Sequence, residues 1–201
     1  RSLRAQYGYH LIAGIDEVGC GCLAGPVVSA AVILADRTPL PFLRDSKLLS
    51  SGQRKTLAAR IKKTALAWSI GSASVEEIDT IGIRPATLLA SERALKTLSI
   101  QPDAAVSDAF FIPNLPFTCH PLVRADRRCR AVAAASIVAK AFRDALMEET
   151  EATHQGYGFA QHKGYGTKEH VIALNRLGPC PLHRRSFEPV RFSLENKKAA
   201  V

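Results

Sequence analysis

Two adjacent carboxylates, Asp16 and Glu17, stand at the end of an apolar run in the stretch "GIDEVGCG". Glycines follow directly, and a second apolar run, "GPVVSAAVIL", comes next. Side chains alternate between the two faces of a strand, so two neighbours on a regular strand point in opposite directions. We expect a bend or bulge at the strand end to bring both carboxyl groups near one point. For this pair alone, two solvated carboxylates in a turn are the alternative.

Two further carboxylates lie later in the chain. Asp108 ends the short apolar run "AAVSD", and aromatic residues rather than turn-forming residues follow it. Asp144 lies in an Ala-rich stretch in which Ser136, Lys140 and Asp144 recur at every fourth position. This spacing predicts one polar seam on an otherwise apolar helix, and the seam must face something polar. A surface ion pair between Lys140 and Asp144, worth about 0.3–0.5 kcal/mol, is the alternative.

Four carboxylates gathered from two strands and a helix would repel one another unless their pKa values rise or a cation lies among them. Ligand sets made only of oxygen suit Mg²⁺ or Mn²⁺ rather than Zn²⁺. Two such ions, about 3.5–4 Å apart, can clamp a scissile phosphate, one activating water and the other stabilising the leaving oxygen. We therefore predict that the catalytic residues are also the ligands of a two-metal site: Asp16, Glu17, Asp108 and Asp144.

The charge of the chain agrees with a phosphate substrate. The 201 residues carry a net charge of +9, and basic residues gather in "RADRRCR", "HKGYGTKEH" and "HRRSFEPVR". Clustered Lys and Arg neutralise phosphates, so a nucleic acid is a plausible partner. A solubilising basic surface is the alternative on charge alone.

The remaining composition excludes several classes of protein. No apolar run reaches 18 residues, so the sequence predicts no membrane-spanning helix. The stretch "RSLRAQYGYH" lacks the apolar segment of a signal peptide, and we expect a cytoplasmic protein. The five cysteines are odd in number and include no Cys-x-x-Cys, which favours reduced thiols over a disulfide framework or a zinc site.

Apolar patterning predicts strands that alternate with helices, followed by a helical last third. Ser74 and Glu77 have the spacing of a capping box, Thr167 is a second N-cap, and Trp68 is expected in the core of a strand. The order of elements predicts an α/β domain with a helical C-terminal part. The expected strands cover residues 9–18, 25–34, 66–74, 103–110 and 117–123, and the expected helices cover residues 45–65, 74–98, 130–152 and 167–178.

Several motifs together resemble bacterial type 2 ribonuclease H (ribonuclease HII): "GIDEVGCGCLAGPVVSAAVIL", "DSKLLS", "AAASIVAKAFRD", "GYGFAQHKGYGTKEH" and "GPCPLHRRSFEPV". The similarity runs from about residue 9 to residue 192. It implies a ribonuclease-H-like fold, with a mixed central β-sheet flanked by helices and a C-terminal helical extension. Residues 1–150 would form the catalytic domain, and residues 151–201 the extension with a substrate-binding loop, within one compact unit.

The resemblance also implies an activity. The family cleaves the RNA strand of RNA–DNA hybrids and incises 5′ of ribonucleotides embedded in duplex DNA, leaving 3′-hydroxyl and 5′-phosphate ends. Its implied role is ribonucleotide removal in DNA repair and replication, and its implied cofactor is Mg²⁺ or Mn²⁺. The expected partners are these nucleic acids and not a membrane. We expect a monomer and leave contact with a sliding clamp open.

By position, the four carboxylates named above match the catalytic residues of the family. Gly19-Cys20-Gly21 matches a Gly-Arg-Gly element that reads the ribose 2′-hydroxyl, aided by a tyrosine that matches Tyr165. The 2′-hydroxyl is the group that distinguishes RNA from DNA. Cys20 stands where the family has Arg, which removes a guanidinium and leaves the backbone of the glycines.

Three more residues lie in stretches that the family uses for substrate binding or its support. They are Ser46 and Lys47 in "DSKLLS", and Arg184 in "HRRS".

Three classes of function follow from these observations. A metal-dependent hybrid nuclease is favoured. A nucleic-acid-binding protein without catalysis is disfavoured because all four carboxylates are present. A metal-dependent enzyme acting on small phosphorylated metabolites is disfavoured because the basic segments are spread along the chain and suit a longer polyanion.

Overall fold

The computed structural model describes residues 3–36, 38–41, 43 and 49–199. Contacts between residues divide the chain into two compact units, which are described separately. Unit 1 comprises Arg1–Val18, Val28–Ser72 and Leu88–Ala141, and unit 2 comprises Gly19–Val27, Ala73–Thr87 and Phe142–Val201. These units are assembled from interleaved segments and do not follow a boundary at residue 150. The division into residues 1–150 and 151–201 stays a prediction.

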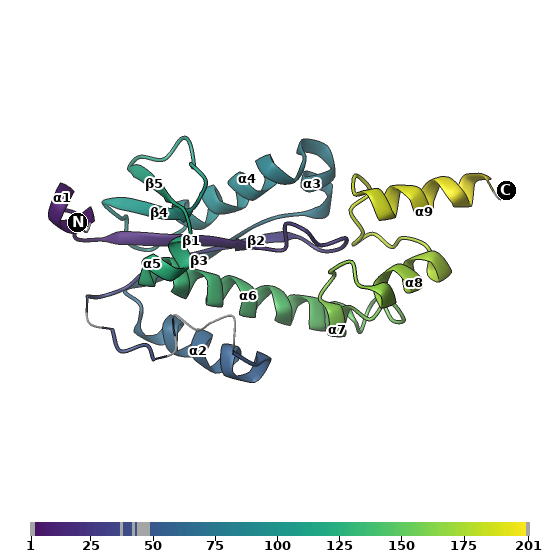
Figure 1. Cartoon of the computed structure of the whole chain (residues 1–201), viewed down its shortest axis with the longest axis horizontal. Helices are drawn as coiled ribbons and strands as arrows, with labels where there is room; N and C mark the ends of the chain where they lie inside the picture. Colours follow the sequence, from purple (N-terminus) through teal and green to yellow (C-terminus); the bar gives the residue numbers. More distant parts are fainter. Residues whose placement is uncertain (1–2, 37, 42, 44–48, 200–201) are drawn as a thin grey trace. The chain divides into compact units, whose positions relative to one another are not determined.

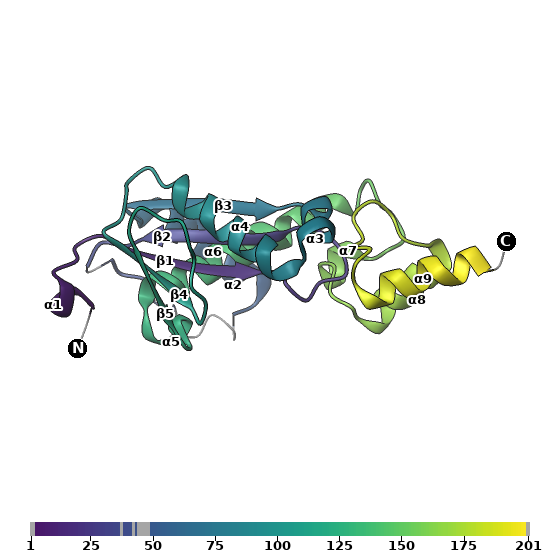
Figure 2. The same ribbon diagram turned by 90° about the horizontal axis from the view of Figure 1, so that it is seen from above.

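A five-stranded mixed sheet forms the centre of unit 1, in the order β3-β2-β1-β4-β5 (Figures 1 and 2). β1 pairs antiparallel with β2 and parallel with β4, and β4 pairs parallel with β5. The strands are β1 (Ile12–Val18), β2 (Val27–Ile33), β3 (Ala67–Ala73), β4 (Ala104–Asp108) and β5 (Thr118–Leu122). This arrangement confirms the expected sheet.

Helices cover both faces of this sheet. α2 (Ser51–Thr64) and the unit 1 part of α6 (Arg130–Thr150) lie on one face, and the unit 1 part of α4 (Ile83–Lys96) lies on the other (Figure 1). On the first face, Ala30 and Val32 of β2 pack against the alanines of α6 and against Leu57 and Ile61 of α2. The second face packs against α4 through a set of small and apolar side chains that includes Ala13, Ile15, Ala31, Ala94 and Leu95.

Two glycines explain how closely the helices approach the sheet. A Cβ on Gly14 of β1 would lie 2.1 Å from the carbonyl carbon of Ala131 in α6. A Cβ on Gly71 of β3 would lie 2.1 Å from the carbonyl oxygen of Ala90 in α4. Because no real Cβ tolerates such distances, glycine at these positions lets helix backbone lie directly on the strands.

Unit 2 combines the loop after β1 and a helical segment, residues 73–87, with the helical end of the chain. Its helices are α3 (Val75–Ile81), the first turn of α4, the second half of α6, α7 (Phe159–His162), α8 (Lys168–Leu177) and α9 (Glu188–Ala199). Leu23 of the first loop packs with Leu174 of α8 and Val190 of α9. Ala24 of the same loop packs with Met147 and Phe159. The loop after β1 is therefore part of the apolar core of unit 2.

Local sequence signals placed most helix ends correctly. The Ser74 side chain accepts a hydrogen bond from the Glu77 N–H, and Glu77 reciprocates as a capping box at α3. Thr167 caps α8 in the same way, and Gly178 ends that helix with a φ of 80°. Four helices among the described residues fall outside the predicted ranges. The short helices α1 (Leu3–Tyr7), α5 (Ala125–Arg128) and α7 span at most five residues each, too few to show a helical period, and α9, in the C-terminal part expected to be helical, was not assigned a range. None of the helices in the described part of the chain is long and apolar enough to cross a membrane.

The prediction for Trp68 was wrong. Its side chain is 38% exposed on β3, an edge strand of the sheet. Burial alternates along this strand, and Trp68 falls on the outward side, where the Lys62 ammonium lies 4.5 Å from the centre of its ring. The alternation of exposed and buried residues, and not the size of the aromatic ring, decides the environment of this residue.

Candidate active site

The two adjacent carboxylates lie within a regular strand. Asp16 pairs with Ala30 and Glu17 pairs with Ser29 in an unbroken antiparallel register, so the expected bend or bulge is absent from this part of β1. Asp16 shares its face with Gly14, which packs on α6, and Glu17 lies on the opposite face. The prediction of a distorted strand end was therefore wrong.

The end of β4 explains how these carboxylates still influence one another. The ladder between β1 and β4 runs from Ile12 to Ile15, and the next residue of β4 after that ladder is Asp108. Asp16 and Glu17 thus extend beyond the last residue of β1 that pairs with β4, at the end of the sheet where Asp108 also lies. The Asp108 carboxylate Oδ1 accepts a hydrogen bond from the backbone N–H of Ala125, at 3.0 Å.

Burial and mutual repulsion raise the pKa values of the Asp16 and Glu17 carboxyl groups. The pKa of Asp16 is raised to about 6, mainly because the carboxyl is buried; a hydrogen bond from Ser136 opposes the rise, and the charges of Asp108 and Asp126 contribute to it. The pKa of Glu17 is raised to about 7, mainly by burial and then by repulsion from Asp16 and Asp108. Both shifts mean that the surroundings of Asp16 and Glu17 disfavour the charged carboxylate. A cation placed among them would return them to the charged form.

One oxygen of this group lacks a partner. Oε2 of Glu17 is buried and has no hydrogen bond from any described residue. A buried oxygen of this kind costs free energy unless a donor or a cation satisfies it. The donor set of carboxylate oxygens fits Mg²⁺ or Mn²⁺. Among the described residues, however, no three Asp, Glu, His or Cys side chains are already arranged for metal coordination. The carboxylates are thus near one another, but their side chains do not adopt the geometry of a metal site.

The fourth predicted ligand, Asp144, belongs to unit 2. It lies on α6 and is only 5% exposed, so its side chain is buried and does not lie on the surface. Of the predicted polar seam, Ser136 belongs to unit 1 and hydrogen-bonds to Asp16. Structure therefore groups Asp16, Glu17 and Asp108, and the participation of Asp144 stays a prediction from the sequence.

Sequence reasoning did not assign a role to Asp126, on the short helix α5 (Ala125–Arg128). Its charge reaches Asp16 and raises the pKa of that group. The charge of this residue belongs to the same acidic environment.

The ribose-reading element predicted at Gly19–Gly21 forms a turn in unit 2. Gly19 has a φ of 94°, and a Cβ there would lie 2.3 Å from Nε of Arg143. Gly21 has no positive φ, and a Cβ there would meet nothing within 4 Å. Gly19 is required by the fold, whereas Gly21 leaves open space beside the chain.

Cys20 and Tyr165 also lie in unit 2. The Cys20 thiol lies 3.4 Å from Oγ1 of Thr87. Tyr165 pairs with Cys22 in an isolated β-bridge, which places the tyrosine beside the loop of Gly19–Gly21. Its side chain is 38% exposed, and burial followed by the neighbouring Cys22 raises the pKa of its phenol. A half-exposed ring next to this loop is available to a ligand.

The remaining predicted substrate residues have different environments. Arg184 is fully buried, and it donates from Nε to the Gly25 carbonyl and from Nη1 to the Cys20 carbonyl. Burial lowers the pKa of its guanidinium to about 10. In this structure Arg184 supports the loop, which is one of the two roles left open by the resemblance. Ser46 and Lys47 lie outside the described residues.

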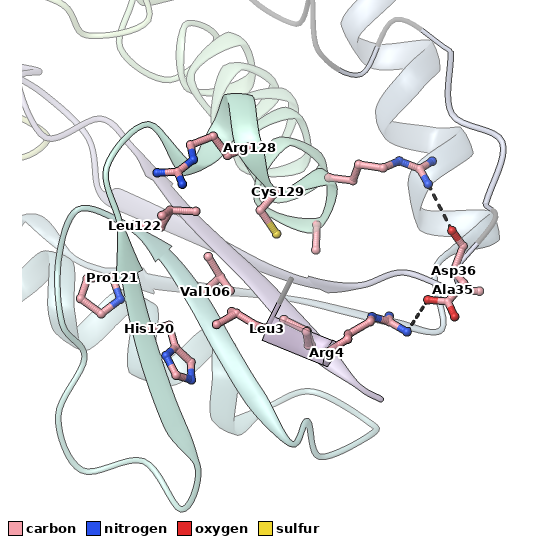
Figure 3. A pocket seen from close by; sticks show the side chains of 13 residues that line it. Leu3, Arg4, Ala35, Asp36, Val106, His120, Pro121, Leu122, Arg128 and Cys129 are labelled. Atoms are coloured by element: carbon pink, nitrogen blue, oxygen red, sulfur yellow. Dashed lines mark hydrogen bonds and ion pairs between the residues drawn. The ribbon is translucent and has the colours of Figure 1, made fainter. Parts of the chain in front are cut away.

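A cavity of about 620 Å³ in unit 1 is separate from these groups. It is lined by residues that include Leu3, Arg4, Ile12, Asp36 and His120, and Figure 3 shows Arg4 directed toward Asp36, with which it forms an ion pair. Ile12 begins β1, whereas the carboxylates lie near the other end of that strand. None of the predicted site residues lines this cavity, so the candidate chemistry lies at the sheet end instead.

Comparison with known protein families decides the assignment. The family model "Ribonuclease HII" matches residues 13–190, which include all four predicted carboxylates, Tyr165 and Arg184. The chain belongs to the ribonuclease HII family. It is therefore a ribonuclease H hydrolase, and the activity of this family is metal-dependent cleavage of RNA–DNA hybrids. This confirms the resemblance seen in the motifs.

Solved structures of similar proteins confirm the fold. The ribonuclease H2 from Pyrococcus horikoshii OT3 is 25% identical with a TM-score of 0.79, over 94% of this chain and 99% of that one. The RNase HII of Archaeoglobus fulgidus, solved as a complex with PCNA, is 27% identical with a TM-score of 0.74, over 89% and 96%. Bst-RNase HIII, solved in complex with Mn²⁺, is 21% identical with a TM-score of 0.73, over 94% and 70%, and shares the fold.

Proposed function

We propose that this ribonuclease HII also incises 5′ of single ribonucleotides in duplex DNA, and that its biological role is ribonucleotide removal in DNA repair and replication. Membership in the family supports this proposal, and so does a turn beside Gly21 that leaves room for a sugar. The observation that carries the catalytic part is the grouping of buried carboxylates around an unpartnered oxygen of Glu17. The proposed products carry 3′-hydroxyl and 5′-phosphate ends.

Asp16, Glu17 and Asp108 are proposed to hold the metal ions, together with Asp144 by its match to the family. When bound, two Mg²⁺ or Mn²⁺ ions would activate water and stabilise the leaving oxygen of the phosphodiester. The protein contributes ionised carboxylates whose repulsion disfavours their charged form without a cation. Ser136 donates a hydrogen bond that favours the charged form of Asp16.

Ribose recognition is proposed to come from the loop of Gly19–Gly21 and from Tyr165. The absence of a side chain at Gly21 allows the backbone to approach a sugar, and the ring of Tyr165 offers a surface for stacking. A hydroxyl that both donates and accepts can be read by backbone groups at such a turn. Deoxyribose would lack this contact.

The decisive experiment compares three substrates, each with and without Mg²⁺ or Mn²⁺. They are an RNA–DNA hybrid, a DNA duplex with one ribonucleotide and plain duplex DNA. We expect metal-dependent cleavage of the first two and none of the third. Cleavage of the hybrid without incision at the single ribonucleotide would overturn the proposed activity while leaving the family assignment intact.

Tyr165→Ala tests the proposed reading of ribose. The substitution removes the ring and leaves the four carboxylates, so metal binding should persist while incision at a single ribonucleotide falls. Stacking of an aromatic ring is worth about 1–3 kcal/mol, which corresponds to roughly a 10- to 100-fold loss. Incision at the wild-type rate would show that Tyr165 is only a packed loop aromatic.

Contact with a sliding clamp is a separate part of the proposal. The Archaeoglobus fulgidus relative was solved as a complex with PCNA, which motivates a test for this chain. Size-exclusion chromatography with light scattering, with and without a clamp, would measure both this contact and the proposed monomeric state. Co-elution with the clamp would support the contact, and separate elution would refute it.

A further inference from the structure

Two arginines of unit 2, Arg143 and Arg184, are both completely buried. Burial of a guanidinium costs several kcal/mol unless its N–H groups find acceptors. The hydrogen bonds of both side chains go to backbone carbonyl oxygens. Each arginine therefore fixes the course of the main chain around it.

Arg143 bonds to two segments that lie far apart in the sequence. Its Nε donates to the Pro26 carbonyl and its Nη2 to the Ala24 carbonyl, both at 2.9 Å. Its Nη1 donates to the Lys163 carbonyl at 2.8 Å. The ring of Tyr165 is centred 5.9 Å from its Cζ. One planar group thus joins the loop of residues 19–26 to the turn that carries Tyr165.

Three glycines make room for this arrangement. A Cβ on Gly19 would lie 2.3 Å from Nε of Arg143, and one on Gly25 would lie 3.3 Å from its Nη2. A Cβ on Gly164 would lie 2.4 Å from the Ala24 carbonyl oxygen and 3.4 Å from the same Nη2. All three glycines have positive φ. Both segments are therefore shaped to fit closely around the guanidinium.

Arg184 provides a comparison within the same unit. It donates to the Cys20 and Gly25 carbonyls, so it also supports the first segment. Its ring contact is with Phe187, 5.0 Å from Cζ, and its hydrogen bonds do not extend to the turn at Lys163–Tyr165. Of the two buried arginines, Arg143 is the one that joins the predicted ribose-reading loop to the predicted stacking tyrosine.

We propose that Arg143 is a positioning residue for ribose recognition, which holds the loop of Gly19–Gly21 and the turn of Tyr165 in one fixed arrangement. This inference rests on the proposed function of those residues. The role requires a planar group with several directed N–H donors, which lysine does not supply. Arg143→Lys keeps the charge and removes the fork, so it separates positioning from charge.

Hydrogen exchange tests the positioning without reference to activity. In Arg143→Lys we expect residues 19–26 and 163–167 to exchange together at least about tenfold faster than in the wild type, because buried hydrogen bonds of about 1–3 kcal/mol are lost. The strands β1 and β4 should exchange at wild-type rates. The matched control, Arg184→Lys, should accelerate residues 19–26 and leave 163–167 protected. Wild-type protection of 163–167 in Arg143→Lys, or equal loosening of the whole chain, would overturn the proposal.

Kinetics on a duplex with one ribonucleotide give the second measurement. Loss of a residue that orients binding groups typically costs about 10- to 100-fold, and we expect this loss in kcat, with KM within about twofold. An unchanged kcat in Arg143→Lys would refute the positioning role. If the lysine variant fails to fold, Arg143→Gln retains a planar donor group and takes its place in both measurements. If the wild type itself does not incise this substrate, the proposed function fails, and the exchange pattern still decides whether Arg143 joins the two segments.

Discussion

The two units differ in how their buried charged groups are compensated. In unit 1, carboxylates are gathered so that they repel one another, and Oε2 of Glu17 has no partner among the described residues. In unit 2, the guanidinium of Arg143 donates three hydrogen bonds to carbonyl oxygens. Nη2 of Arg184 lacks a hydrogen bond, but Nε and Nη1 of this residue also bind carbonyls.

This difference separates a site from its support. A buried guanidinium that donates several hydrogen bonds to main-chain carbonyls holds the chain in place, whereas a group of like charges with an unsatisfied oxygen is ready to accept a cation. The acidic group of unit 1 is thus a candidate for chemistry, and the arginines of unit 2 are candidates for positioning. Removal of one charge from each region should consequently have different effects.

The largest effect is expected for Asp16→Asn. This substitution removes the charge of a predicted metal ligand, and loss of several kcal/mol of metal-assisted catalysis corresponds to at least about 10³-fold in cleavage of a hybrid. Hybrid binding should be retained, because the basic residues are unchanged. The thermal midpoint of the metal-free protein should stay equal or rise, since one repelling charge is lost. Cleavage assays, binding titrations and thermal unfolding measure the three quantities.

Asp126→Asn is the matched control for that substitution. Asp126 raises the pKa of Asp16 through its charge but is not a predicted ligand. Its variant should keep cleavage within about tenfold of the wild type, as for a residue that tunes a ligand from outside the coordination sphere. Equal losses for the two variants would remove the distinction between ligand and neighbour.

The next effect separates the two glycines of the ribose-reading turn. Gly19→Ala forces a side chain into a positive φ and against Arg143, which should cost about 2–4 kcal/mol of unfolding free energy. Gly21→Ala meets open space at an ordinary φ and should change stability by less than about 0.5 kcal/mol. Urea unfolding of both variants is the measurement. A destabilised Gly21→Ala would mean that this position also serves the fold.

Gly21→Val tests whether the open space at Gly21 serves substrate binding. It should leave the stability close to that of Gly21→Ala while reducing incision at a single ribonucleotide, because the larger side chain occupies the space proposed for the sugar. Full incision by Gly21→Val would place the sugar elsewhere.

A third prediction concerns pH, for which the two regions have opposite signs. The Cys180 N–H donates to Nδ1 of His183, so the Nε2–H of His183 donates to Nε2 of His170 at 3.1 Å. This series of hydrogen bonds requires that both imidazole rings be neutral. Burial, followed by the nearby His170, lowers the pKa of His183 to about 4, and His154 and His162 act in the same direction. The stabilisation is present above pH 6.5 and is lost as the pH falls through about 4, by at most about 3 kcal/mol.

The carboxyl groups of unit 1 behave in the reverse way in the metal-free protein. The raised pKa values of Asp16 and Glu17 contribute stability at low pH that is lost as the pH rises through about 6 and about 7. Unfolding free energies between pH 4 and pH 8 for the wild type, His183→Gln and Asp16→Asn test both signs. The unfolding free energy of the histidine variant should depend less on pH at the acidic end of this range, and that of the aspartate variant should depend less on pH near neutrality. The same dependence in all three proteins would contradict the prediction.

The smallest effect is expected for Cys20→Arg, which restores the residue usual in the family. A guanidinium can bind a phosphate, so hybrid binding should be unchanged or tighter. One additional phosphate contact should steepen the dependence of log K on log salt by about one unit. Binding titrations at several salt concentrations measure this slope. Weaker binding by the variant would show that the loop no longer accommodates the arginine.

Much of the protein was predictable from the sequence alone. Capping at Ser74 and Thr167, the apolar runs of the strands and the long Ala-rich helix depend on residues close to one another in the chain. The motifs around Asp16, Asp144 and Tyr165 indicated the family from the sequence alone, because each combines residue types rarely found together at such spacings.

Tertiary structure decided the environments of the same residues. The sequence did not reveal that Asp16 and Glu17 lie in a regular strand. Their pairing with β2 continues, whereas the pairing of β1 with β4 ends at Ile15, and both depend on strands that are distant in the sequence. It did not distinguish Gly19 from Gly21, since the difference is the side chain of Arg143, more than a hundred residues later. Nor did it show that Arg184 is buried and Trp68 exposed. Local patterns determine helices, strands and caps, whereas burial and partners depend on which remote segments pack together.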